Sequence, residues 1–193
     1  MRMWIPCAIA LALAGCAGAP APKEQFFTLA SARPEAPPAA SQSPSVFVGP
    51  VSVPEAVDRT QLVLRTGPNQ VDVADDLRWA EPLRNAIPRF LAEALSRDLG
   101  SSRVLASRMA AGSPVDFRVA IEVQRFDSSL EDGATIDALW TLSTPSGPSR
   151  SGRSIVHEPA ASHDAAGVVA AHARALERIA HEIAEAIRAA RSR

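Results

Sequence analysis

Cys16 is the residue whose surroundings most clearly predict a covalent reaction. It follows Leu13-Ala14-Gly15 at the end of an apolar run of about a dozen residues, which is too short to span a bilayer and fits a signal peptide. Small residues before a cysteine admit the extended backbone to a protease site. The thiol can take a diacylglyceryl group, and cleavage frees the amine for a further acyl chain such as palmitate. We expect a lipoprotein signal peptide over residues 1–15 and lipidation of Cys16.

The segment after Cys16 has the composition of a tether. Ala and Pro make up half of residues 16–25, and a linker rich in Pro, Ala and Ser continues around 30–44. Between these stretches Phe26-Phe27 predicts a first strand, since two adjacent Phe side chains are costly to leave in water. We therefore expect a tether of roughly 30 Å and a domain over residues 26–193. Residue 17 is Ala rather than Asp, which favours the periplasmic face of the outer membrane over inner-membrane retention.

Two further motifs come close to hydrolase patterns and fail. The stretch Gly147–Gly152 approaches the Gly-x-Ser-x-Gly nucleophile elbow, but its last glycine is one position late. His181-Glu182 begins a zinc-peptidase motif, but Glu185 stands where the second histidine is needed. We therefore expect no enzyme.

The remaining composition argues against metal, disulfide and nucleic-acid chemistry. Both cysteines lie within the first sixteen residues, so no thiolate metal site and no internal disulfide is expected in the domain. The acidic group Asp72, Asp75 and Asp76 lacks the glycine and closing glutamate of a calcium loop, and we interpret it as a surface loop. The net charge of −1 offers no basic excess for phosphates, so nucleic acid is excluded as a partner. No cofactor is predicted.

The pattern of apolar residues predicts a mixed α/β (α+β) domain. Strands are expected in residues 45–54, with Pro50 at an edge or bulge, in a hairpin over 62–73, and in segments 115–123, 136–142 and 154–157. A middle helix at about 83–99 and a long helix at about 165–190, capped by Asp164, carry apolar stripes. We expect one sheet covered by these two helices.

One long stretch resembles a known family. The sequence Val48-Gly49-Pro50-Val51-Ser52-Val53-Pro54 continues to Asp58-Arg59-Thr60-Gln61-Leu62-Val63-Leu64-Arg65, and Arg78-Trp79-Ala80-Glu81-Pro82-Leu83 follows. Together with the lipid-attachment motif, this resembles the PqiC-like family of ABC-type transport auxiliary lipoproteins. Val123–Asp127, Ala138–Trp140 and the closing helix are also similar to the family's pattern.

The resemblance implies a non-enzymatic partner of an Mce-type transport system. Its partners would be an Mce-domain protein and the associated ABC permease and ATPase, and its role would be to dock the machine at a membrane. Such systems move phospholipids or related molecules between inner and outer membranes and so maintain membrane integrity. Because these partners form rings, a homo-oligomer stays an open alternative, although no residue pattern demands one.

Arg59, Arg65 and Trp79 are the candidate partner contacts, because Trp and Arg are enriched at interface hot spots. The alternative is structural: Trp79 caps the core, while Arg78 or Arg65 pairs with Glu81. A second hypothesis for the whole chain is a lipid carrier with an apolar cavity. The small number of large apolar side chains, with six Phe and three Trp, disfavours a large pocket.

Overall fold

The computed structural model describes residues 23–31, 43–106, 112–145 and 147–192. These residues form a single eight-stranded sheet and two helices, as expected for the mixed class. The strands are β1 (Gln25–Phe27), β2 (Val46–Ser52), β3 (Gln61–Gly67), β4 (Gln70–Trp79), β5 (Val104–Leu105), β6 (Phe117–Ser129), β7 (Gly133–Ser143) and β8 (Arg150–Glu158). The helices are α1 (Leu83–Leu99) and α2 (Ala165–Arg191).

Strand β6 organises the sheet. It pairs antiparallel with β7 on one side, and β7 pairs in the same way with β8. On its other side β6 pairs parallel with β2 along its first half and meets β3 near its end, where Leu64 lies opposite Ser128. The β3–β4 hairpin continues the sheet, and β1 adds to β4 in parallel. The chain's first strand is therefore part of the domain sheet, as predicted, but only Phe27 packs against the core, whereas Phe26 is 62% exposed.

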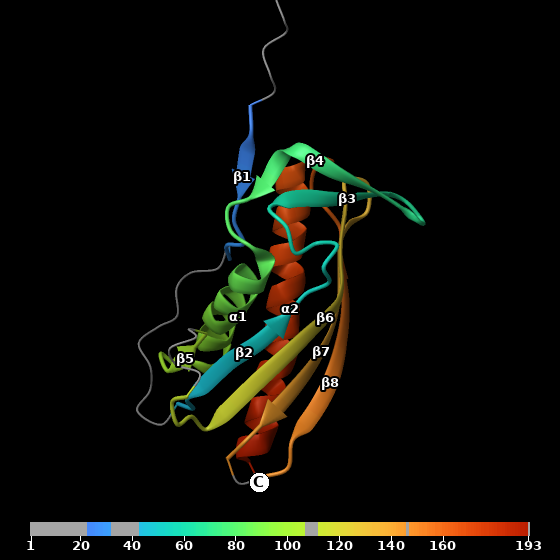
Figure 1. Cartoon of the computed structure of the whole chain (residues 1–193). Helices are drawn as coiled ribbons and strands as arrows, with labels where there is room; N and C mark the ends of the chain where they lie inside the picture. The colour runs from blue at the N-terminus through green and yellow to red at the C-terminus, as the bar shows by residue number, and fades with distance from the viewer. Residues whose placement is uncertain (1–22, 32–42, 107–111, 146, 193) are drawn as a thin grey trace, which may run out of the picture.

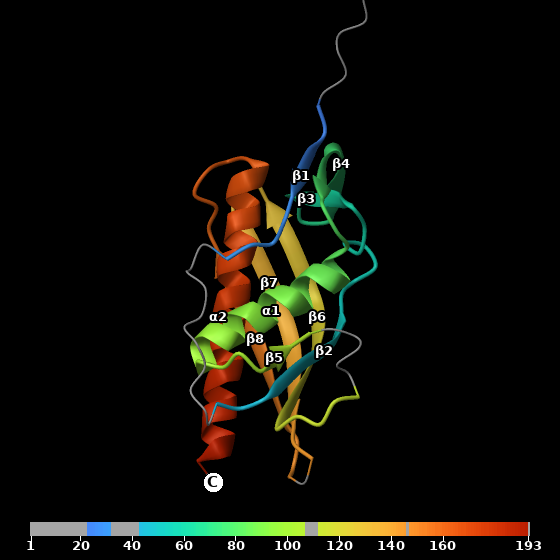
Figure 2. The same cartoon turned by 90° about the vertical axis from the view of Figure 1, so that its left-hand side faces the viewer.

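Both helices lie on the same face of this sheet (Figures 1 and 2). α2 runs along β7 and β8, whereas α1 crosses beside β2. The alternating apolar residues of the strands meet the two helical stripes there, in one continuous core. The largest side chains that are fully buried in it are Leu62, Leu83, Ile87, Phe90, Leu91, Leu95, Ile136, Leu142, Leu176, Ile179, Ile183 and Ile187.

The helix ends follow from local sequence. Asp164 has extended backbone angles and accepts the Gly167 N–H at 2.7 Å, so it caps α2 as predicted. α1 ends at Gly100, whose φ of 57° is left-handed, and the Gly100 N–H returns to the Arg97 carbonyl. Pro88 lies inside α1, at its sixth position rather than in the first turn.

Two strand predictions need correction or extension, and a third is confirmed. Asp72, Asp75 and Asp76 belong to strand β4 and not to a surface loop, because the hairpin with β3 runs on to Trp79. β6 extends beyond residue 123 to Ser129, since a bulge after Val123 shifts the alternation by one residue. Pro50 lies where the β2–β6 register shifts, so the predicted bulge is confirmed.

The domain is elongated, and its two ends are formed by different parts of the chain. The chain enters at β1, beside β4 and the β3–β4 hairpin, while the C-terminal end of α2 lies at the opposite end (Figure 1). α2 has 27 residues. At 1.5 Å per residue it separates these ends by roughly 40 Å. An anchor before β1 would thus hold one end of the domain near the membrane.

Candidate functional surfaces

Cys16 lies outside the described residues, so its lipidation stays a prediction. None of the described helices is long and apolar enough to cross a bilayer. The first described residues, Lys23 and Glu24, are exposed and lead directly into β1.

Trp79 is a packing residue of the core. Its side chain is only 4% exposed. Its ring meets the rings of Phe126 and His172 edge-on, with centroid distances of 6.2 and 6.3 Å. Phe126 and His172 stack face to face at 3.9 Å. This three-ring cluster joins β4, β6 and α2. The burial of Trp79 supports the alternative in which its side chain packs on the core and does not contact a partner.

His172 is the buried titratable group of this cluster. Its Nε2 lies 2.8 Å from the Ser128 hydroxyl, and its Nδ1 has no hydrogen-bond partner within the described structure. Removal from water penalises the imidazolium, so burial lowers the pKa of His172 to about 3, although the nearby Asp127 carboxylate opposes this. The ring is therefore neutral at physiological pH and serves as an aromatic packing element.

Arg65 lies on the other face of the sheet, within β3 rather than at its flank. Its guanidinium donates to both carboxylate oxygens of Asp127, at 2.9 and 3.0 Å, and also to the Pro68 carbonyl at 3.1 Å. Arg125 donates to the same carboxylate. Burial alone would raise the pKa of Asp127, but the hydrogen bonds from the two arginines outweigh it and hold that pKa below its usual value. Arg65 thus ties the hairpin to β6.

The three candidate contacts do not form one patch. Arg65 contacts Asp127, and Trp79 contacts Phe126. Because Phe126 and Asp127 are adjacent on β6, their side chains project to opposite faces of the sheet. Arg59 is exposed in the loop before β3. The predicted pairing with Glu81 is wrong, because Arg89 holds Glu81. Contact of these residues with a partner stays a prediction, and the buried Trp79 could act only by positioning its neighbours.

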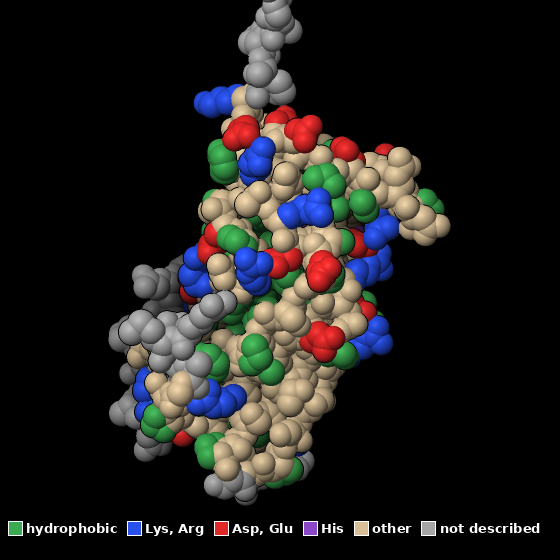
Figure 3. Space-filling view, in the orientation of Figure 1, with side chains coloured by type: hydrophobic (Ala, Val, Ile, Leu, Met, Phe, Trp, Pro, Cys, Tyr) green, Lys and Arg blue, Asp and Glu red, His purple; other side chains and the backbone are tan. Residues whose placement is uncertain are grey.

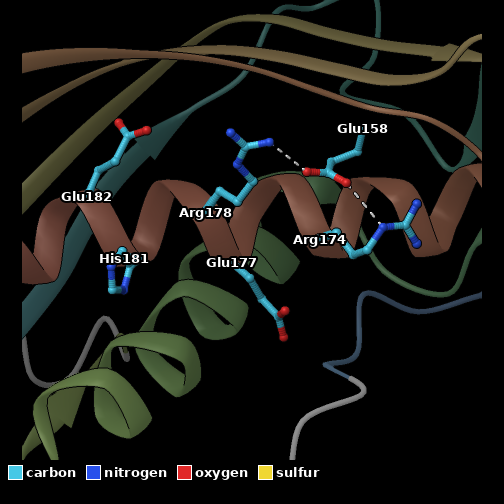
Figure 4. A pocket seen from close by; sticks show the side chains of 6 residues that line it. All are labelled: Glu158, Arg174, Glu177, Arg178, His181 and Glu182. Carbon is cyan, nitrogen blue, oxygen red and sulfur yellow. Dashed lines mark hydrogen bonds and ion pairs between the residues drawn. The ribbon is translucent and has the colours of Figure 1, made fainter.

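An open depression of about 500 Å³ lies along α2. It is lined by Glu158, Arg174, Glu177, Arg178, His181 and Glu182. Figure 4 shows Glu158 between Arg174 and Arg178, which donate to its two oxygens at 3.2 and 3.0 Å. All six lining side chains end in charged or ionisable groups, and the depression is open to solvent, so it does not enclose an acyl chain. Sequence reasoning missed it, since Glu158 lies far from its partners along the chain.

The two stretches that approach hydrolase motifs do not adopt the geometry that those motifs require. Ser149 precedes β8 with both flanking residues exposed or half-buried, and no helix follows it as a nucleophile elbow requires. His181 contacts Asp98 at 3.3 Å on the surface. Within the described ranges, no group of three or more His, Cys, Asp or Glu is arranged to hold a metal ion.

Comparison with known proteins gives one matching family and crystal structures with a similar fold. The family model of the ABC-type transport auxiliary lipoprotein component matches residues 27–184, which is well over half of the chain. A crystal structure of a Xanthomonas campestris protein assigned to the family model DUF330 is similar, with a TM-score of 0.67, 22% identity, and coverage of 83% of this chain and 92% of that one. A crystal structure of an uncharacterized protein has a TM-score of 0.66 and 18% identity, and covers 86% and 99%.

No curated protein matches the chain. The two structural likenesses, both below 25% identity, establish the fold alone. The family match extends from β1 into the last third of α2 and includes the hairpin, the three-ring cluster and Arg65 with its partner Asp127. The chain therefore belongs to the family of ABC-type transport auxiliary lipoprotein components.

Proposed function

We propose that this chain is the membrane-anchored docking component of an Mce-type ABC transporter that moves lipid between the inner and outer membranes. Its family is that of transport auxiliary components, which associates it with a transport system. In this proposal an Mce-domain protein, with its permease and ATPase, is the partner. The chain itself is not an enzyme.

The observation that carries the proposal is the match of nearly the whole domain to this family, joined to the predicted lipid attachment at Cys16. The structure adds a single packed domain whose two ends lie roughly 40 Å apart, with β1 at one of them. A domain of this length can reach a partner some distance from the membrane that anchors it. Ala17 favours the outer membrane as that membrane.

The alternative of a lipid carrier finds less support. The apolar side chains of the sheet and both helices pack into one core. The depression along α2 is open and lined by charged or ionisable groups. A lipid-binding site buries most of its ligand in a largely enclosed cavity, which this open depression does not provide.

Affinity purification of the natively lipidated chain from envelope membranes, followed by mass spectrometry, tests the proposal. Recovery of an Mce-domain protein with a permease or an ATPase supports it. The Cys16→Ala variant is the matched control and should recover less of them, because it lacks the anchor. Recovery of the chain alone with bound phospholipid would contradict docking and favour a carrier.

A further inference from the structure

Strand β8 forms the longest free edge of the described sheet. Within the described residues it pairs with β7 alone, and the backbone on its other side makes no hydrogen bond. The sheet also ends at β1 and β5, but these strands have three and two residues, whereas β8 has nine. A free strand of this length presents a row of unpaired N–H and C=O groups with which another strand can pair.

The usual devices that block a free edge are missing from β8. The strand contains no proline, and its pairing with β7 runs from Arg150 to Glu158 without a register shift, so no bulge twists it away. Its exposed charge, Arg153, donates from Nε and Nη2 to Asp137 of β7, at 2.9 and 2.6 Å. The arginine therefore leans toward β7 and leaves the free edge open.

Exposed apolar side chains accompany the free edge on the open face of the sheet, which is the face opposite the two helices. Ile155 of β8 is 64% exposed, and Leu139 of β7 is 40% exposed. Because Ile155 is opposite Asp137 and Leu139 is opposite Arg153, the two apolar side chains are diagonal neighbours on this face. A strand added to β8 would place one of its own side chains against Ile155.

The free edge is also basic. Residues 150–157 include two arginines, one histidine and no acidic residue. Glu158, which ends β8, is already bound by two arginines of α2. Figure 3 shows Lys and Arg side chains along the β8 side of the open face. Arg153 directs two of its five N–H donors to Asp137 and is 58% exposed, so it can also bind a carboxylate on an added strand.

A second copy of this chain does not supply that carboxylate. Antiparallel pairing of two β8 strands about a two-fold axis joins like faces of the two sheets. The residue opposite Arg153 would then be Ser151, Ile155, His157 or Arg153 itself, and none of these is acidic. Charge complementarity therefore favours a different protein that presents an extended acidic segment.

We propose that an extended segment of the transport partner adds to β8 as a further strand, with an acidic residue opposite Arg153 and an apolar residue opposite Ile155. Backbone hydrogen bonds along the free edge supply the affinity, and these two positions supply the selectivity. The identity of the partner rests on the proposed function.

The binding test uses a fluorescent nine-residue peptide in which Glu, Leu and Glu are separated by Thr. It is titrated with the full lipidated chain in uncharged detergent micelles, and its anisotropy reports binding. Arg153→Gln with Ile155→Ser should weaken binding about tenfold. The matched control is Arg84→Gln with Leu105→Ser, which removes an ion-paired arginine and an exposed leucine outside β7 and β8. Equal weakening by the two pairs, or no binding by the wild-type chain, would overturn the proposal.

Two N-methylated forms of the peptide distinguish strand addition from adhesion to the surface. In an extended peptide the N–H groups point alternately to the two sides, so methylation of every second nitrogen removes the donors on one side only. One of the two complementary forms should lose binding and the other should keep it, and the bound peptide should slow amide hydrogen exchange in β8. Equal binding of the two forms, or unchanged exchange in β8, would contradict strand addition.

Two further measurements decide the occupant. Sedimentation of the wild-type chain should show no dimer that the Arg153/Ile155 variant dissociates, and such a dimer would make a second copy the occupant. In the envelope purification, loss of the transporter by this variant and not by the Arg84/Leu105 variant supports the proposal. Equal recovery by the two variants would overturn it and leave the proposed function standing. If the wild-type chain recovers no transporter, the proposed function fails, and the peptide titration alone decides whether β8 accepts a strand.

Discussion

Acidification should destabilise the domain through His172. In the unfolded chain this histidine has the ordinary pKa of 6.5, whereas burial lowers it to about 3 in the folded state. Between these values the unfolded state binds more protons, so the free energy of unfolding falls as pH falls through that window. Each pH unit below the unfolded pKa costs about 1.4 kcal/mol, so the loss between pH 7 and pH 5 is about 2 kcal/mol.

Urea denaturation of residues 23–193 at the two pH values measures this loss. The His172→Gln variant should lose most of the difference, whatever its stability at pH 7. His157→Gln is the matched control, because His157 is exposed on β8 and its replacement should leave the difference unchanged. The lowered pKa of Asp127 and Asp137 affects stability only near or below pH 3.8, outside the window. An equal pH effect in wild type and His172→Gln would refute the reasoning.

Three further predictions concern the backbone, the anchor and the domain. Gly133→Ala should destabilise the domain by about 2 kcal/mol or more in the same urea assay, because φ is 98° there and a Cβ would lie 2.2 Å from the Glu158 carbonyl oxygen; unchanged stability would contradict this. Cys16→Ala should give a folded chain that leaves the membrane fraction, and wild-type-like fractionation would exclude lipidation there. Residues 23–193 should keep their circular dichroism in a metal chelator, and unfolding by the chelator would reveal a structural metal ion.

The elements with a strong local signal could be predicted from sequence. The bounds of α1 and α2 follow from their apolar periodicity and from the cap at Asp164. The end of β6 could not be predicted, because the bulge after Val123 breaks the alternation that identifies a strand. Asp75 and Asp76 looked like loop residues because aspartate has low strand propensity, and they lie where the β3–β4 register shifts, between the pairs Val63–Val73 and Gln61–Arg78.

The candidate residues show the same limit. Residue type alone suggested Arg65 and Trp79 as contacts with a partner protein, but the environment of each side chain depends on residues that are distant in sequence. Asp127 is 62 positions from Arg65, and the Ser128–His172 contact spans 44. No local sequence pattern indicates side-chain contacts over such distances along the chain.

The central claim, an auxiliary role in lipid transport, is tested most directly by phospholipid transfer between the two membranes of living cells. After a pulse of labelled precursor, the membranes are separated and the label in each is followed over time. The account predicts that cells lacking this chain transfer lipid as slowly as cells lacking the ATPase recovered with it, and that losing both slows transfer no further. Transfer at the wild-type rate, or an additive loss in the double deletion, would contradict it.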